Sequence, residues 1–293
     1  MQAVGKNVSR FQPGDEAFGI GKGSYAEYVC AREDKLAHKP VNLTFEQAAV
    51  IAISGSTSLQ ALRDHGKVRK GQEVLIIGAS GGVGTYALQI AKAFGARVTG
   101  VCSTQKVEMV LSIGADYVID YTREDFAESG RRYDLIVDIG GNSSLARLRR
   151  ALTLQGTLVI VGGEGGGRWL GGTDRQLRAM MLAPFVGQKL VTFVNNENHE
   201  DMLALKDLIA SGKITPVIDR TYPLAQVPEA IRYLKGGHAQ GKVVISVCCA
   251  GQRSNHGSGA PRRRGEGNGR SPTHVIAQAN HQGRAAGNGT HRR

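Results

Sequence analysis

The chain has 293 residues, of which 41% are hydrophobic, and can therefore hold one large or two modest domains with substantial cores. It contains no apolar run of the roughly eighteen residues that a membrane helix needs, and no apolar segment follows Met1. Its four cysteines show neither the spacing of metal ligands nor that of a disulfide framework. These features argue against a membrane-spanning or disulfide-built protein and predict a cytoplasmic one with no membrane partner.

The net charge of +12 is concentrated near one end of the chain. Residues 248–293 hold eight arginines, no lysine and one acidic residue, Glu266, and so carry +7 of that total. The segment lacks aromatic residues and cannot bury enough apolar surface to offset the entropy lost on ordering it. We predict a disordered basic tail over 248–293. On composition, a tail without function is favoured over an arm that binds nucleic acid, so a nucleic-acid partner is not expected.

The first 45 residues have the pattern of part of a small β domain. A Pro-Gly pair at 13–14 marks a turn, and short strands are predicted over 17–20 and 24–30. Thr44 is followed three residues later by Gln47, which is the spacing of a capping box, so a helix is expected to begin there.

The stretch over residues 73–94 organises the rest of the chain. Its apolar block at 74–77 predicts a parallel strand buried on both faces, and the apolar residues that follow at intervals of three and four predict a helix. The turn between them reads Gly-Ala-Ser-Gly-Gly-Val-Gly, in which Gly81 and Gly84 match the last two glycines of the G-x-G-x-x-G fingerprint and Ala79 replaces the first.

This glycine turn, residues 78–84, predicts a site for the pyrophosphate of a dinucleotide. Glycines let the backbone approach the phosphates, and the positive end of the following helix stabilises their charge. A structural glycine turn without a ligand is the alternative. The residues expected to bind are Ser80, Gly81, Gly82, Val83 and Gly84.

No carboxylate follows the next predicted strand, residues 96–101. Proteins that bind NAD usually place Asp or Glu there, about 20 residues beyond the glycines, to bind the ribose hydroxyls. The hydroxyl of Ser103 and the ammonium of Lys106 could instead hold a 2′-phosphate, which favours NADP(H) over NAD(H). Taken alone, Lys106 is better explained as a solvated residue at a helix start.

Strands and helices then alternate, which predicts an α/β fold with a doubly wound parallel sheet, the Rossmann architecture, over residues 46–212. Ligands of such sheets lie at the carboxyl ends of the strands, where Gly140 and Gly162 fall. Residues 190–194 are predicted to form an edge strand that could pair with its copy in a homodimer. Residues 213–247 predict strand, helix and strand, which we expect to complete the small domain of 1–45.

Four motifs occur in order along the chain: residues 13–19, residues 23–28, the glycine turn, and Gly-Lys-Val-Val-Ile at 241–245. Together they resemble the zeta-crystallin-like quinone oxidoreductases of the medium-chain dehydrogenase/reductase superfamily, over residues 4–247. The resemblance implies a GroES-like β domain packed on the Rossmann domain, with the substrate between them. It implies hydride transfer from NADPH to a quinone or to an activated C=C or carbonyl acceptor. It also implies that the family's opening strands are missing before Ala3, so the chain looks N-terminally truncated.

Several site residues follow from the resemblance alone. Thr57 matches the family threonine beside the nicotinamide amide, and Tyr121 joins Ser103 and Lys106 among the positions that hold the 2′-phosphate. The loops at Gly140 and Gly162 match those that flank the ribose and nicotinamide. Lys242 resembles a C-terminal lysine near the cofactor, with a solvated residue at a strand start an equally good interpretation. No residue pattern identifies a catalytic acid or base, so none is assigned and the proton is expected to come from water.

Zinc is not expected, because a structural zinc needs four closely spaced cysteines and a catalytic zinc needs Cys or His with a carboxylate. The histidines 38, 65, 199 and 238 are scattered without such partners. Three alternatives stay open beside a zinc-independent reductase. They are a truncated NADP(H)-binding protein with little or no activity, a zinc-type alcohol dehydrogenase relative that has lost its ligands, and a nucleic-acid binder acting through the arginine tail.

Overall fold

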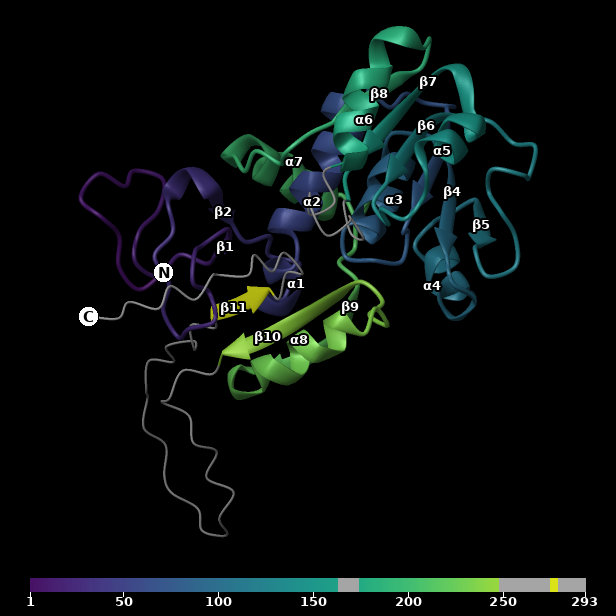
Figure 1. Cartoon of the computed structure of the whole chain (residues 1–293). Helices are drawn as coiled ribbons and strands as arrows, with labels where there is room; N and C mark the ends of the chain where they lie inside the picture. Colours follow the sequence, from purple (N-terminus) through teal and green to yellow (C-terminus); the bar gives the residue numbers. More distant parts are fainter. Residues whose placement is uncertain (163–173, 248–274, 279–293) are drawn as a thin grey trace, which may run out of the picture.

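The computed structural model describes residues 1–162, 174–247 and 275–278. Within these residues a six-stranded parallel sheet forms the centre of the larger part of the molecule (Figure 1). In spatial order its strands are β5 (Tyr117–Asp120), β4 (Arg97–Cys102), β3 (Glu73–Ile77), β6 (Tyr133–Asp138), β7 (Leu152–Ile160) and β8 (Lys189–Thr192). Counted from β3, this order is 3-2-1-4-5-6, that of the doubly wound dinucleotide fold. The predicted α/β class with a Rossmann sheet is confirmed.

Alternate side chains of β3 enter two different apolar cores, as expected for a strand buried on both faces. Val74 and Ile76 belong to one core, and Leu75 and Ile77 belong to the other. The first core also receives side chains from α2 (Ala52–Leu59), α3 (Gly84–Ala93), α4 (Val107–Ser112) and α7 (His199–Ala210). The second receives side chains from α5 (Leu145–Ala151) and α6 (Asp174–Leu182).

The predicted capping box is confirmed at the start of α1 (Phe45–Ala49). The Thr44 hydroxyl accepts from the Gln47 amide at 3.2 Å, and the Thr44 amide donates to the Gln47 side chain at 3.0 Å. Helix α2 continues as a π-helix, Gln60–His65. Single π turns inside α-helices often occur at functional sites. No helix in the described part of the chain is both long and apolar enough to span a membrane.

The N-terminal residues form less regular structure than predicted. β1 (Ala17–Gly19) pairs antiparallel with β2 (Leu36–His38), but the strand predicted over 24–30 is wrong, because those residues have no ladder. Tyr28 in this segment is 62% exposed. A strand needs a neighbour to satisfy its backbone, and among the described residues β1 and β2 pair only with each other.

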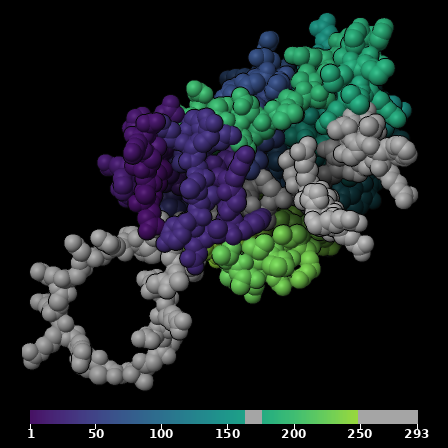
Figure 2. Space-filling model, turned by 60° about the vertical axis from the view of Figure 1, so that its left-hand side comes forward, coloured from purple at the N-terminus to yellow at the C-terminus, as the bar shows by residue number. Residues whose placement is uncertain are grey.

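The C-terminal residues form a parallel β-α-β unit made of β9 (Ile218–Pro223), α8 (Val227–Lys235) and β10 (Lys242–Val247). Ala230 of α8 packs on Val243 and Ile245 of β10. Helix α1 contacts both β1 and β10, and Figure 2 shows its indigo segment beside the light green of α8 and β10. β9 and β10 lie in a sheet separate from that of β1 and β2. The predicted domains therefore stay a prediction: a small domain of 1–45 completed by 213–247, a Rossmann domain of 46–212, and a tail of 248–293.

The predicted disordered tail, 248–293, lies outside the described residues except for β11 (Val275–Gln278). These four residues correct the prediction locally, because they pair antiparallel with β10 at 244–247. They include the adjacent Val and Ile of the tail, and β-branched residues favour strands.

Candidate dinucleotide-binding site

The glycine turn joins β3 to α3 where the strand order of the sheet reverses, which is where such sheets bind ligands. Gly78 has φ +85°, a conformation that L side chains rarely adopt. The amide of Gly81 donates to the Gly78 carbonyl at 3.1 Å and tightens the turn. A Cβ on Gly84 would collide with that same carbonyl and lie 2.8 Å from the backbone of Ala79. Glycine at 84 therefore allows α3 to start directly against β3.

The turn is also docked on the chain that enters β10. The Gly241 amide donates to the Ser80 carbonyl at 2.9 Å, and Gly81 and Gly241 form an isolated parallel bridge. The bridge joins two residues that are about 160 positions apart in the sequence. It brings the next residue, Lys242, alongside the turn.

Lys242 is buried, with 6% of its surface exposed, which contradicts the interpretation of a solvated strand-start residue. Its Nζ donates to the Ser54 hydroxyl at 2.9 Å. A Cβ on Gly82 would lie 2.7 Å from the Lys242 Cδ, so a glycine at 82 leaves room for the lysine. Burial lowers the pKa of Lys242 to about 7.

Helix α2 also borders the turn. The Ser58 hydroxyl donates to the Val83 carbonyl at 2.8 Å, which fixes the start of α3 against α2. Thr57 is half-buried on α2, and its hydroxyl donates to the Ile53 carbonyl at 2.7 Å. Thr57 thus lies on the helix whose Ser54 accepts from Lys242 and whose Ser58 donates to the glycine turn.

Ser103, Lys106 and Tyr121 gather at the carboxyl ends of the adjacent strands β4 and β5. The Tyr121 amide donates to the Cys102 carbonyl at 3.1 Å, and the Tyr121 side chain is 63% exposed. Lys106 Nζ donates to the carbonyls of Gly237 and Ala239 at 3.2 and 3.0 Å. Burial lowers the pKa of Lys106. The three predicted phosphate ligands therefore share one end of the sheet.

One carboxylate at this end escaped the sequence analysis, because it is the last residue of β5 and does not follow β4. Asp120 accepts from the hydroxyls of Thr104 and Thr122 at 2.5 and 2.7 Å. The hydrogen bond from Thr104 contributes most to lowering the pKa of Asp120, and the one from Thr122 lowers it further. Both carboxylate oxygens of Asp120 are thus engaged within the protein.

The two remaining predicted residues lie at the ends of β6 and β7. The Gly140 amide donates to the Ile77 carbonyl at 3.1 Å, and a Cβ on Gly78 would lie 3.1 Å from that amide nitrogen. A Cβ on Gly162 would collide with the Ile139 carbonyl. The ends of β3, β6 and β7 therefore meet through glycines that pack backbone on backbone.

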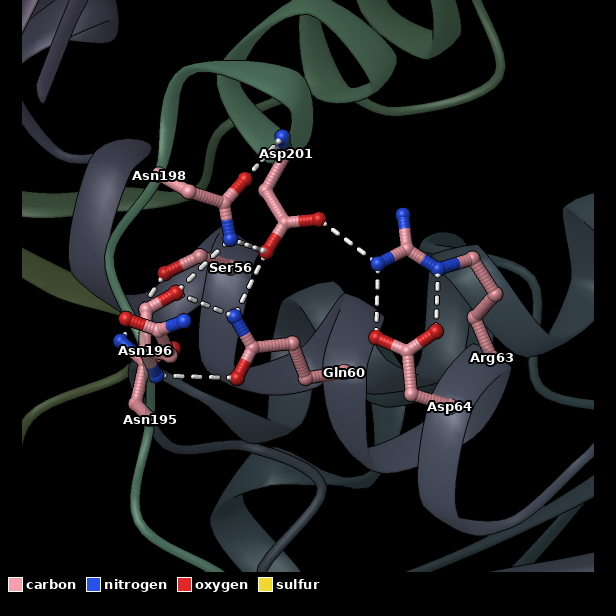
Figure 3. A network of polar contacts seen from close by, with 8 residues as sticks. All are labelled: Ser56, Gln60, Arg63, Asp64, Asn195, Asn196, Asn198 and Asp201. Carbon is pink, nitrogen blue, oxygen red and sulfur yellow. Dashed lines mark hydrogen bonds and ion pairs between the residues drawn. The ribbon is translucent and has the colours of Figure 1, made fainter. Parts of the chain in front are cut away.

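A buried polar network, which sequence reasoning missed, joins α2 and its π-helix to the loop after β8 (Figure 3). Asp201, 1% exposed, accepts from Gln60 Nε2 at 2.6 Å and from Arg63 Nη2 at 2.7 Å. Gln60 also exchanges two hydrogen bonds with the backbone of Asn196, at 2.7 and 3.1 Å. Asn195 Nδ2 donates to the Ser56 hydroxyl at 3.0 Å. The network fixes the helix that carries Thr57.

No group of three or more His, Cys, Asp or Glu side chains among the residues in 1–162, 174–247 and 275–278 is arranged to hold a metal ion. These residues do not fit a zinc site. The prediction of a zinc-independent protein concerns the whole chain and stays a prediction.

Comparison with known proteins agrees with this geometry. The family described as zinc-binding dehydrogenase matches residues 113–245. A mitochondrial NAD(P)H oxidoreductase of Mus musculus is 37% identical over 271 residues, which cover 84% of this chain and 68% of the relative. The quinone oxidoreductase structure from Coxiella burnetii superposes with a TM-score of 0.74 at 30% identity, over 83% of this chain and 75% of that one. A mycobacterial protein complexed with NADPH gives a TM-score of 0.71 at 26% identity, over 83% and 79%.

The sheet order and the glycine turn are those of a dinucleotide-binding protein of the Rossmann class, and the relatives identify it as an oxidoreductase. With the relatives above, the chain belongs to the medium-chain dehydrogenase/reductase family, in its zeta-crystallin-like quinone oxidoreductase branch. The resemblance that the motifs indicated is confirmed.

Proposed function

We propose that this protein transfers hydride from NADPH to a quinone or to an activated C=C or carbonyl acceptor, without zinc. The observation that carries the proposal is the glycine turn at the switch point of the sheet, closed by Gly84 and flanked by the buried ammonium of Lys242. The names of the relatives support it, since they include an NAD(P)H oxidoreductase and a quinone oxidoreductase.

The residues present fit NADP(H), because a Cβ on Gly78, Gly82 or Gly84 would meet backbone atoms or Lys242, so these glycines keep the turn tight. A Cβ on Gly81 would have only the Gly78 carbonyl within 4 Å, so the backbone there is open to the approach of a phosphate. When bound, the nicotinamide supplies the hydride. The chain's own groups bind and orient: the turn with Lys242 for the diphosphate, Ser103, Lys106 and Tyr121 for the 2′-phosphate, and Thr57, Gly140 and Gly162 for the nicotinamide end. Orientation and the exclusion of water are proposed to supply most of the rate acceleration, with the proton taken from water.

The test is the oxidation of NADPH, followed by absorbance, with a panel of quinones and enones. We expect turnover with at least one acceptor and none with saturated ketones lacking activation. NADPH binding measured by calorimetry without turnover on any acceptor would instead favour the inactive NADP(H)-binding alternative. Absence of both binding and turnover in a folded sample contradicts the proposal.

Lys106→Ala is expected to reduce the preference for NADPH. Loss of a charged hydrogen bond to phosphate costs about 1.5–3 kcal/mol, so the Kd for NADPH should rise about 10–150-fold while that for NADH stays unchanged. Calorimetric titration with both cofactors measures the change. Lys70→Ala is the control, since Lys70 is exposed and precedes β3 at the opposite end of the sheet. Equal losses for NADPH and NADH would contradict the assignment of Lys106 to the 2′-phosphate.

We also propose that the protein forms a homodimer through the edge strand β8. An edge strand offers unpaired backbone groups, and the nearby Leu154 and Phe185 are 89% and 84% exposed. Light scattering should therefore give the mass of a dimer, which Leu154→Glu with Phe185→Glu should convert to a monomer. Val41→Glu, in the exposed loop before α1, is the control and should leave the dimer intact. A wild-type monomer would contradict the proposal.

The cytoplasmic location stays a prediction of the sequence, because the mouse relative is named as mitochondrial. The small-molecule acceptor is the partner that we propose, and binding to nucleic acid is not part of the proposed function.

A further inference from the structure

The side-chain amine of Lys242 lies inside the protein beside the glycine turn. It is the first residue of β10, its side chain lies over Gly82, and a Cβ on Gly82 would be 3.1 Å from Lys242 Nζ. One hydrogen bond holds it, to the Ser54 hydroxyl at 2.9 Å, and that contact joins residues 188 positions apart. Ser54 itself is 2% exposed. The amine is thus held on one neutral oxygen, away from water.

Among the described residues, none of the elements around Lys242 brings a charge to it. Helix α2 and the glycine turn contain no ionisable residue, and neither does β11. On β9, Asp219 accepts from the Tyr233 hydroxyl at 2.6 Å and from the Gln240 amide at 3.2 Å. The other ionisable residues on elements packed against β10 are partly or fully exposed: Glu46 on α1, Arg220 and Tyr222 on β9, and Glu229, Arg232, Tyr233 and Lys235 on α8.

A buried amine without a counter-charge favours its neutral form, because desolvation penalises the ammonium. Burial is the cause that lowers the pKa of Lys242 to about 7, so the neutral amine is populated near neutrality. An anion placed on the glycine turn would reverse this balance, since an opposite charge nearby favours the charged form.

We propose that binding of the dinucleotide diphosphate at the glycine turn is coupled to uptake of one proton by Lys242, with Ser54 as the residue that positions the ammonium. This rests on the proposed function, because it requires a dinucleotide on the turn. The neutral amine gains one proton from solvent, no covalent bond changes, and the charge formed neutralises part of the diphosphate.

The pH dependence follows from the linkage of protonation to binding. The pKa of Lys242 is lower in the free protein than in the complex. The affinity for NADPH is therefore greatest below pH 7 and falls as the pH rises above it. With one proton taken up, the Kd for NADPH should increase with pH above 7 and approach a slope of about tenfold for each pH unit.

The experiment is calorimetric titration of the full chain with NADPH at pH 8, in two buffers of different ionisation enthalpy. At this pH the 2′-phosphate, with a pKa of about 6, is fully ionised and does not contribute protons. We expect close to one proton taken up by the wild type. Heat of binding that is equal in the two buffers overturns the inference while leaving the proposed function intact. No heat in either buffer overturns both.

Three variants separate Lys242 from other groups. Lys242→Met should abolish proton uptake and make the Kd independent of pH between 7 and 9, at a weaker affinity than the wild type at pH 7. Ser54→Ala should retain the uptake but move the pH midpoint of the Kd profile lower, because the ammonium loses its acceptor; an unchanged midpoint overturns the positioning role. Lys106→Met is the control, since burial also lowers the pKa of Lys106. Uptake that persists in Lys242→Met and disappears in Lys106→Met overturns the inference.

Discussion

Replacing Asp201 by alanine is expected to lower the free energy of unfolding by about 2–4 kcal/mol, because buried donors lose their acceptor and each such group costs about 1–3 kcal/mol. Asp201 is 1% exposed and accepts from Gln60, Arg63 and Asn198. Arg63 keeps its hydrogen bonds to Asp64, which are 2.6 Å long, so the loss falls mainly on Gln60 and on the start of α7.

Denaturant unfolding measures this change. Asp207→Ala is the matched control, since it makes the same chemical change at an exposed position of the same helix and should alter stability by no more than about 0.5 kcal/mol. Asp201→Asn, which keeps one acceptor oxygen, should fall between the two. If Asp201→Ala is as stable as Asp207→Ala, the network in Figure 3 does not hold the β8–α7 loop on α2.

Gly84→Ala should both destabilise the protein and weaken NADPH binding. Its Cβ would meet the Gly78 carbonyl and lie 2.8 Å from the Cα of Ala79, which are backbone atoms of a short turn between buried elements. Overpacking of this kind lowers the free energy of unfolding by about 1–3 kcal/mol. Because the turn is opened, the Kd for NADPH should rise at least about tenfold. Thermal unfolding and calorimetric titration measure the two effects.

Gly81→Ala provides the contrast within the same turn. A Cβ on Gly81 would meet the Gly78 carbonyl at 3.5 Å, an ordinary contact, so the folded protein should keep its stability. The second glycine of the fingerprint lets the backbone approach the pyrophosphate, and affinity for NADPH should therefore drop. A Gly81→Ala variant with unchanged NADPH affinity would argue that the phosphates do not lie on this turn.

Local patterns determined much of this protein from the sequence alone. The apolar block at 74–77 predicted a strand buried on both faces, the Thr44–Gln47 spacing predicted a capped helix, and the alternation of elements predicted the doubly wound sheet. Each of these signals depends on residues a few positions apart, whose propensities and spacings act on the backbone directly. The glycine turn was recognisable for the same reason.

Only the tertiary structure decided which side chains meet across the chain. Sequence reasoning weighed Lys242 equally as a solvated residue, and it is buried because the turn holds Gly82 beneath it and Ser54 lies 188 positions away to accept its hydrogen bond. It predicted a strand over 24–30, where the fold offers no neighbouring edge among the described residues. Burial and pairing depend on the packing of distant segments, which neither spacing nor propensity encodes locally.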